Sequence, residues 1–251
     1  MGSSDAIRIP KAGELVADEL RRRIVIGELQ PGDQFPPEGL LAEQFQVAQT
    51  SVREALRILE SEGLVSVRRG SPGGGQVREP DPQTLARYAS LLLQFEGATV
   101  EDVHLARIMI EPLTARRLAE HPDRTSLAEI LARALGDEDA SHGQPEELAR
   151  MEGRFHQLVT RLAGNETLAL LSAVSNLIVA HHVNQVLADS RRRNGRAGSG
   201  FATAHRAHGR LVKLVAAGDA DAVEQLWRRH LEEALNNLGA VGRTTVADLM
   251  G

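Results

Sequence analysis

Four side chains in the second half of the chain have types suited to binding a divalent cation. Glu152 and His156 are four residues apart in a segment that predicts a helix, so they lie on one face of it. His208 and His230 follow on two successive predicted helices. One carboxylate and three imidazoles form a donor set that suits Zn, Ni or Mn. The alternative is that these are four unrelated helix residues, since the chain contains 9 histidines.

A second group of polar side chains, nearer the N-terminus, suits contact with DNA. Gln49, Thr50, Ser51 and Arg53 cluster at the start of a predicted helix. Arginine can bind guanine, and glutamine adenine, through paired hydrogen bonds, whereas hydroxyl groups hold phosphates. The alternatives are that Thr50 and Ser51 only cap the helix, and that Arg53 is a solvated surface residue.

The elements that would position this group form a small N-terminal domain. Apolar spacing predicts helices over 12–27, 36–45 and 50–62. The positions expected to face inward are Leu15, Val16, Leu20, Ile24, Val25, Leu40, Leu41, Phe45, Val52, Ala55, Leu56 and Leu59. Strand-like runs at 64–67 and 76–78 flank a loop rich in Gly and Arg, which predicts a β-hairpin. Two short helices joined by a tight turn and followed by a hairpin are typical of a winged helix-turn-helix.

The remainder of the chain predicts a mainly α fold. A Pro-containing break at 79–82 divides the sequence into domains 1–80 and 81–251. The second domain shows no convincing strand, and its glycine-marked breaks predict an all-α bundle of about seven helices. These helices are expected at 82–96, 99–120, 124–140, 144–163, 166–190, 199–217 and 219–240.

Composition limits the class of protein. Hydrophobic residues make up 42% and charged residues 25%, which is typical of a folded globular chain. The chain has no cysteine, so it has no disulfide and no thiolate ligand, which fits a reducing cytoplasm. No apolar run reaches the length of a membrane span. The net charge is −5, so DNA binding depends on local basic residues, and the arginines of 44–78 supply them.

Several motifs together resemble the GntR family of bacterial regulators, in the subfamily with a FadR-type C-terminal domain. They are the Pro31-Gly32 turn, Pro36-Pro37-Glu38, the run TSVREAL at 50–56, and Gly63-Leu64-Val65 before the glycine-rich loop. The resemblance implies that the third helix enters the major groove and that Arg69 and Gly70 reach the minor groove from the wing. Gly39 and Gln49 stand where the family often carries arginine, which implies an altered operator sequence.

The same resemblance also implies which residues bind the metal ion. It implies that Glu152, His156, His208 and His230 hold the ion, with Glu152 at a position where the family carries the shorter aspartate. Arg107 and Glu111 match the family's Arg-x-x-x-Glu, where the arginine can face the effector cavity and bind a carboxylate. The alternative for this pair is an i, i+4 salt bridge on the surface.

The expected function is a cytoplasmic, homodimeric DNA-binding regulator, most simply a repressor released by a small carboxylate effector. Two copies would read two operator half-sites about one DNA turn apart. The alternatives are a metal-free sensor of acyl-CoA, in which the histidines are incidental, and a metal-dependent hydrolase. The hydrolase lacks a second catalytic base in a persuasive position and leaves the DNA-reading half unexplained. We therefore expect no enzymatic activity and no membrane partner.

Overall fold

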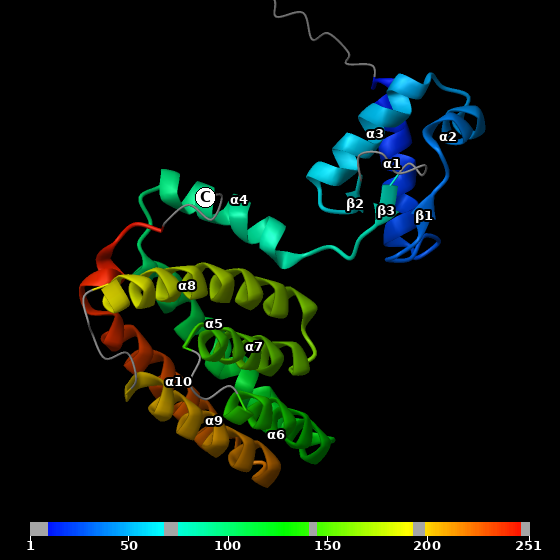
Figure 1. Cartoon of the computed structure of the whole chain (residues 1–251). Coiled ribbons are helices and arrows are strands. Elements are labelled where there is room, and N and C mark those ends of the chain that lie inside the picture. Colours follow the sequence, from blue (N-terminus) through cyan, green and yellow to red (C-terminus); the bar gives the residue numbers. More distant parts are fainter. Residues whose placement is uncertain (1–9, 68–74, 141–144, 193–198, 247–251) are drawn as a thin grey trace, which may run out of the picture. The chain divides into compact units, whose positions relative to one another are not determined.

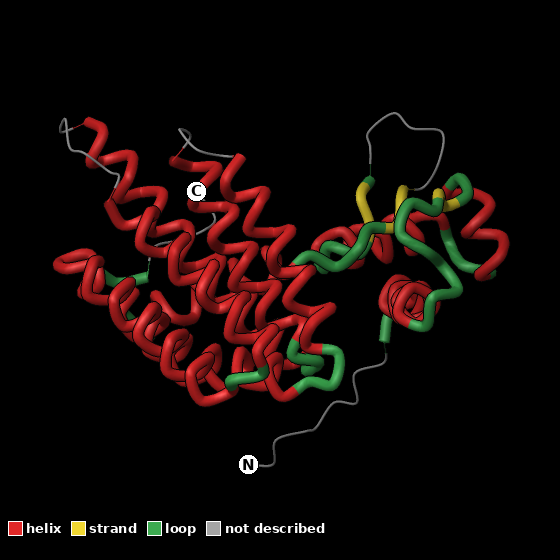
Figure 2. The backbone as a smooth tube through the Cα atoms, turned by 90° about the horizontal axis from the view of Figure 1, so that it is seen from below, coloured by secondary structure: helices red, strands yellow, loops and turns green. Residues whose placement is uncertain are grey.

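The computed structural model describes residues 10–67, 75–140, 145–192 and 199–246 (Figure 1). The chain forms two compact units, each with many contacts within itself, and the first unit ends at Thr84. Figure 2 shows that the described strands all belong to the first unit and that the second is built from helices. The fold class expected from the sequence is therefore confirmed. None of the described helices is both long enough and apolar enough to cross a membrane.

The first unit combines three helices with a small sheet. Its elements are α1 (Ala12–Val25), β1 (Gln34–Phe35), α2 (Glu38–Phe45), α3 (Gln49–Ser61), β2 (Val65–Ser66) and β3 (Gly75–Val77). The sheet is antiparallel, in the order β1-β3-β2. The expected hairpin is thus the β2–β3 pair of a three-stranded sheet. The sequence did not indicate β1, because two residues are too few to show an alternating pattern.

Close packing of α1 against α3 decides which side of α1 is buried. A Cβ atom at Gly13 would lie 2.8 Å from a carboxylate oxygen of Glu54, so glycine lets the two helices approach. Ala17 follows one turn later and is fully buried. This stripe of small residues faces α3, and Leu15 and Val25 are consequently exposed by 54% and 74%. Their expected inward positions were wrong.

The sequence predicted the buried face of α3 more accurately than that of α2. The four core positions expected on α3 are all buried: Val52, Ala55, Leu56 and Leu59. On α2 the buried residues are Leu41 and Ala42, while Leu40 is 55% exposed and Phe45 is half-buried. The prediction for Leu40 was wrong because this short helix has only two turns, which leaves its apolar face poorly determined by spacing alone.

The described residues after β3 contain seven helices, and the first of them, α4, begins just before the second unit. They are α4 (Pro82–Phe95), α5 (Val100–Glu120), α6 (Arg124–Ala140), α7 (Pro145–Leu162), α8 (Glu166–Arg192), α9 (Ser199–Ala217) and α10 (Ala220–Leu238), followed by the 3-10 turn Gly239–Arg243. Their bounds lie within two residues of the expected ones. One isolated β-bridge joins Thr99 to Thr245.

Helix α5 occupies the interior of this unit, because it contacts each of α6, α7, α8, α9 and α10. A capping box fixes its start: the Thr99 hydroxyl accepts from the Asp102 backbone N–H, and the Asp102 carboxylate accepts from the Thr99 N–H. Pro112 lies inside the helix and cannot donate to the carbonyl of Ile108. Arg228 of α10 donates to that carbonyl instead, at 3.4 Å. The carbonyl that the proline leaves without its helical donor is thus paired across to α10.

Candidate metal centre and nucleic-acid interface

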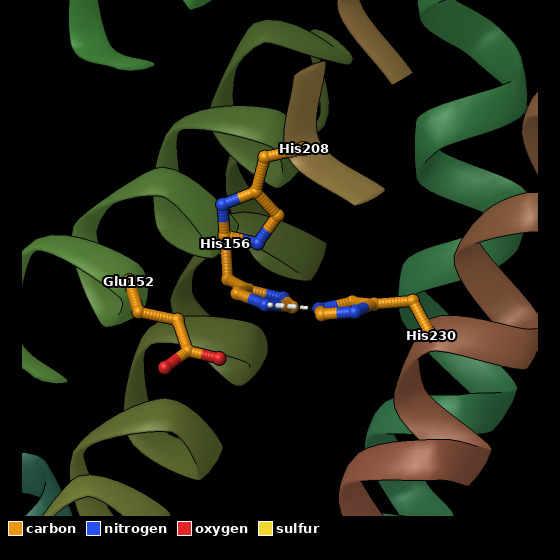
Figure 3. A group of neighbouring side chains, drawn as sticks. All are labelled: Glu152, His156, His208 and His230. Carbon is orange, nitrogen blue, oxygen red and sulfur yellow. Dashed lines mark hydrogen bonds between the residues drawn. The ribbon is translucent and has the colours of Figure 1, made fainter. Parts of the chain in front are cut away.

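Three helices of the second unit bring the four expected metal ligands into one cluster (Figure 3). Glu152 and His156 come from α7, His208 from α9 and His230 from α10. One donor atom from each lies within 4.8 Å of those of the others. The three histidines are buried, and Glu152 is half-buried. Residues far apart in sequence thus form a compact set of one oxygen and three nitrogen donors.

The geometry of the histidine pair fits a bound cation. The Nε2 atoms of His156 and His230 face each other at 3.2 Å. Neighbouring ligand atoms of a tetrahedral zinc lie roughly 3.4 Å apart, since zinc–nitrogen bonds are about 2.0–2.1 Å long. On its other side, Nδ1 of the His156 ring lies 2.6 Å from the Glu111 carboxylate and 3.1 Å from Arg107 Nη2. An ionised carboxylate can only accept a hydrogen bond, so the tautomer that satisfies Glu111 has its proton on Nδ1 and leaves Nε2 with a lone pair toward His230, as a metal ligand must.

Glu111 of α5 connects several of these groups. Its carboxylate is fully buried and accepts from Arg107 Nε at 2.7 Å and from Trp227 Nε1 at 3.3 Å, in addition to His156. Burial alone would raise the pKa of Glu111, but the Arg107 guanidinium and the His156 ring outweigh it and hold the pKa below its usual value. Glu111 is therefore ionised and fixes the orientation of His156.

Burial also sets the charge of the histidines. It lowers the pKa of His156 to about 4, although Glu111 opposes the shift. It lowers the pKa of His230 to about 2, with a further contribution from His156 and His208. Both rings are consequently neutral near pH 7, and neutral imidazole is the form that binds metals.

Aromatic side chains hold the imidazole rings in place. Phe155 stacks on His208, with ring centroids 4.2 Å apart and planes inclined by 9°. The Trp227 ring lies 4.6 Å from that of His156 and 4.9 Å from that of His230. These contacts restrict the rings before any ligand binds, so the cluster is preorganised.

A cavity of about 90 Å³ adjoins the cluster and includes Glu152, His156 and His230 in its wall. Arg107, the expected effector-binding residue, also lines it. The alternative for Arg107, a salt bridge with Glu111, is present too, but it is buried and not on the surface as expected. His104 and Asn176 line the same cavity. Sequence reasoning missed both, although His104 lies one helical turn before Arg107.

The polar group on the first unit sits at the exposed start of α3. Gln46 ends α2 in the left-handed conformation, with φ 54°, and turns the chain into α3. The residue before α3 is Ala48, which makes no side-chain cap, so the capping alternative for Thr50 and Ser51 was wrong. Gln49, Thr50 and Arg53 are exposed, and Ser51 is half-buried.

Glu38 of α2 organises part of this tip. Its carboxylate accepts from Arg53 Nη2 at 2.8 Å and from Gln49 Nε2 at 3.5 Å. Arg53 is therefore exposed and paired with Glu38, an arrangement compatible both with a DNA contact and with a solvated surface residue. The wing residues Arg69 and Gly70 lie outside the described residues.

Both units match known sequence families. Residues 12–73 match the bacterial regulatory proteins of the gntR family, and residues 102–233, more than half of the chain, match the FCD domain. The chain belongs to the GntR family of transcriptional regulators, with an FCD domain. This GntR-family regulator is also 26% identical, over 240 residues, to the HTH-type transcriptional repressor NanR of Escherichia coli K12 and of Shigella flexneri. The alignment covers 94% of this chain and 87% of the relative.

The fold of the GntR-family regulator is similar to a solved structure, that of Streptococcus agalactiae GntR. The TM-score is 0.64 at 21% identity, covering 89% of this chain and 99% of that one. Family membership places the chain among transcriptional regulators and not among enzymes. The hydrolase alternative is accordingly set aside.

Proposed function

We propose that this regulator is a cytoplasmic, homodimeric repressor that binds operator DNA and releases it when a small carboxylate binds beside a divalent metal ion. The observation that carries the proposal is the buried Glu152–His156–His208–His230 cluster opening onto a cavity, in a chain whose other unit is a GntR DNA-binding unit. The action as a repressor follows the NanR relatives.

The cluster and the cavity together suit a carboxylate effector. A divalent ion held by these four residues, whether Zn, Ni or Mn, would supply a Lewis-acidic position for a carboxylate oxygen. Arg107 adds a second positive charge to the same cavity. The longer side chain of Glu152 needs no backbone shift to reach the cluster, since its carboxylate already lies within 4.8 Å of the imidazole donors.

The size of the cavity favours a small effector over acyl-CoA. Pockets for drug-sized ligands measure about 300–1,000 Å³, whereas this cavity measures about 90 Å³. An acyl chain with a nucleotide would require the surrounding helices to separate. A carboxylate of a few carbon atoms fits the space as it stands.

The exposed tip of α3 is the proposed DNA-reading surface, with Arg53 as its principal base contact. Replacing Arg53 with Ala should weaken operator binding by about 1–3 kcal/mol, because a bidentate contact to guanine is lost. Fluorescence anisotropy with a labelled operator measures the change. Arg210→Ala, which removes the same charge from an exposed position on α9, is the matched control. Equal affinity of Arg53→Ala and wild type would remove Arg53 from the interface.

An apolar stripe on α4 supports the homodimer. Leu85, Tyr88, Leu92 and Phe95 follow one another at a 3-4-3 spacing and are exposed by 45%, 57%, 66% and 84%. This spacing is typical of a helix that packs lengthwise against another. A second copy is the occupant that operator recognition requires, since paired recognition helices read two half-sites. The opposite face of α4 is buried within its own unit.

Metal content is the first test of the proposal. We expect protein purified without a metal-affinity step to hold close to one divalent ion per chain by elemental analysis. We expect His156→Ala to hold far less, because a ligand is lost. A carboxylate effector should then lower operator affinity only in the metal-loaded wild type, since release requires different affinities for the two states. Wild-type protein without metal, even after incubation with Zn, Ni or Mn, would refute the metal centre.

A further inference from the structure

His104 is a buried polar side chain that nothing in the metal cluster explains. It lies on α5 and is only 2% exposed. Neither of its ring nitrogens has a hydrogen-bond partner among the described residues. Almost all buried polar groups in native proteins are paired, so an exception indicates a partner that comes from outside the chain.

The cavity beside the metal cluster is where that partner would sit. His104 lines it together with Arg107 and His156. His104 is not one of the four residues whose donor atoms converge, so it stands next to the ion-binding group and outside it. One water molecule needs about 10–15 Å³ of such volume, and the cavity measures about 90 Å³. It therefore accommodates several water-sized groups, or one small molecule that replaces them.

The charge state of His104 limits what it can recognise. Burial lowers its pKa to about 3, and the nearby Arg107 guanidinium contributes in the same direction. The ring is therefore neutral, with one N–H donor and one acceptor nitrogen. A hydroxyl group matches this pair, because it can both accept and donate. A second carboxylate would find no positive charge on this ring.

Asn176 of α8 adds a second uncharged polar group to the wall. It is 4% exposed, and its Nδ2 donates to the buried Ser172 hydroxyl at 3.1 Å. This bond fixes the plane of the amide. Apolar side chains, among them Val179 and Leu231, line the space between the polar groups. The wall therefore offers charge at the metal cluster and neutral hydrogen bonding at His104 and Asn176.

From this arrangement we infer that His104 is the specificity-determining residue of the effector site and that it selects a small hydroxycarboxylate over the same acid without its hydroxyl. The carboxylate faces Arg107 and the metal cluster, and the hydroxyl bonds to His104, with Asn176 as a neighbouring partner. The inference rests on the proposed function, since it assigns the effector class of that same site.

The test compares propanoate, 2-hydroxypropanoate and 3-hydroxypropanoate as ligands of the zinc-loaded, full-length protein, measured by calorimetric titration. We expect wild type to bind one hydroxy acid at least about 10-fold more tightly than propanoate, the effect of one well-placed hydrogen bond. His104→Leu should abolish this preference, while zinc content and propanoate affinity stay within about 2-fold of wild type. His104→Gln, which keeps a donor and an acceptor, should restore part of the preference. His205→Leu, a histidine on α9 outside the cavity wall, is the control.

A second measurement separates recognition from a structural role. In the metal-free protein, His104→Leu should melt at the same temperature as wild type or higher, because it removes a buried group without a partner. A lower melting temperature, or a hydroxyl preference that survives in His104→Leu, would overturn the inference. Zinc uptake and propanoate binding without any hydroxyl preference would overturn it as well and leave the proposed function intact. Absence of both zinc uptake and carboxylate binding would overturn the proposed function itself.

Discussion

At the scale of single residues, the proposed metal site includes a carboxylate that is not one of the proposed ligands. Glu111 receives hydrogen bonds from His156, Arg107 and Trp227 while fully buried. Outer groups of this kind fix the tautomer and direction of a ligating histidine. In this position Glu111 would leave Nε2 of His156 available to a bound ion.

Glu111→Gln should weaken zinc binding by about 10- to 100-fold, the usual effect of changing an outer partner of a ligating histidine. The neutral amide keeps only one of the two acceptor oxygens and no longer supplies the charge that orients His156. Competition with a chromogenic chelator measures the zinc affinity. Glu120→Gln, on the same helix but exposed and paired with Arg116, is the matched control and should bind zinc as wild type does. Equal affinities in the two variants would contradict the positioning role.

At the scale of elements, α4 and α5 differ in how much of their surface is buried. Helix α5 contacts five other helices and carries the buried residues around the cavity. Helix α4 buries Ala86 and Ser90 and leaves the opposite apolar stripe exposed. One helix thus carries residues of the candidate site, and the other exposes the apolar stripe on which we propose that a second copy packs.

The double variant Leu92→Glu with Phe95→Glu should convert the proposed dimer to a monomer, because two charges would enter the apolar stripe that we propose as its interface. Analytical ultracentrifugation at micromolar concentration measures the mass directly. The matched control is Val25→Glu with Ile26→Glu, which places the same charges at exposed apolar positions where α1 ends, 74% and 56% exposed. A charged variant of α4 that remains dimeric would show that the second copy binds elsewhere.

At the scale of the whole molecule, the two functions belong to two units of one chain. The proposed DNA-reading residues lie before Thr84 and the metal cluster lies after it. Substitutions in the proposed metal cluster should therefore weaken the response to an effector more than they weaken operator binding without effector.

His230→Ala should abolish the rise in melting temperature that zinc produces in wild type, while operator affinity without effector stays within about 3-fold. A ligand present at 100 times its dissociation constant stabilises the folded state by about 2.7 kcal/mol, and loss of one of three imidazoles removes most of that gain. Differential scanning fluorimetry with and without zinc gives the first quantity, and anisotropy with labelled operator gives the second. A variant that keeps the full zinc-dependent rise would show that His230 is not a ligand.

The sequence by itself determined the helices and the side chains available for chemistry. Helical periodicity and glycine breaks are local signals, so seven helices of the second unit were predicted within two residues of their bounds. The spacing of Glu152 and His156 on one helix is local as well. The motifs at 50–56 and 63–65, which lie in α3 and directly after it, predicted the helix-turn-helix through their resemblance to a known family.

Only the tertiary structure decided which faces of those helices meet. Leu15 turned outward because Gly13 and Ala17 let α1 approach α3. Glu111 and Arg107 form a buried pair, and not a surface one, because α5 is enclosed by the other helices. His104 gained its place in the cavity wall for the same reason. Burial and pKa depend on neighbours distant in the sequence, and spacing along one helix carries no information about them.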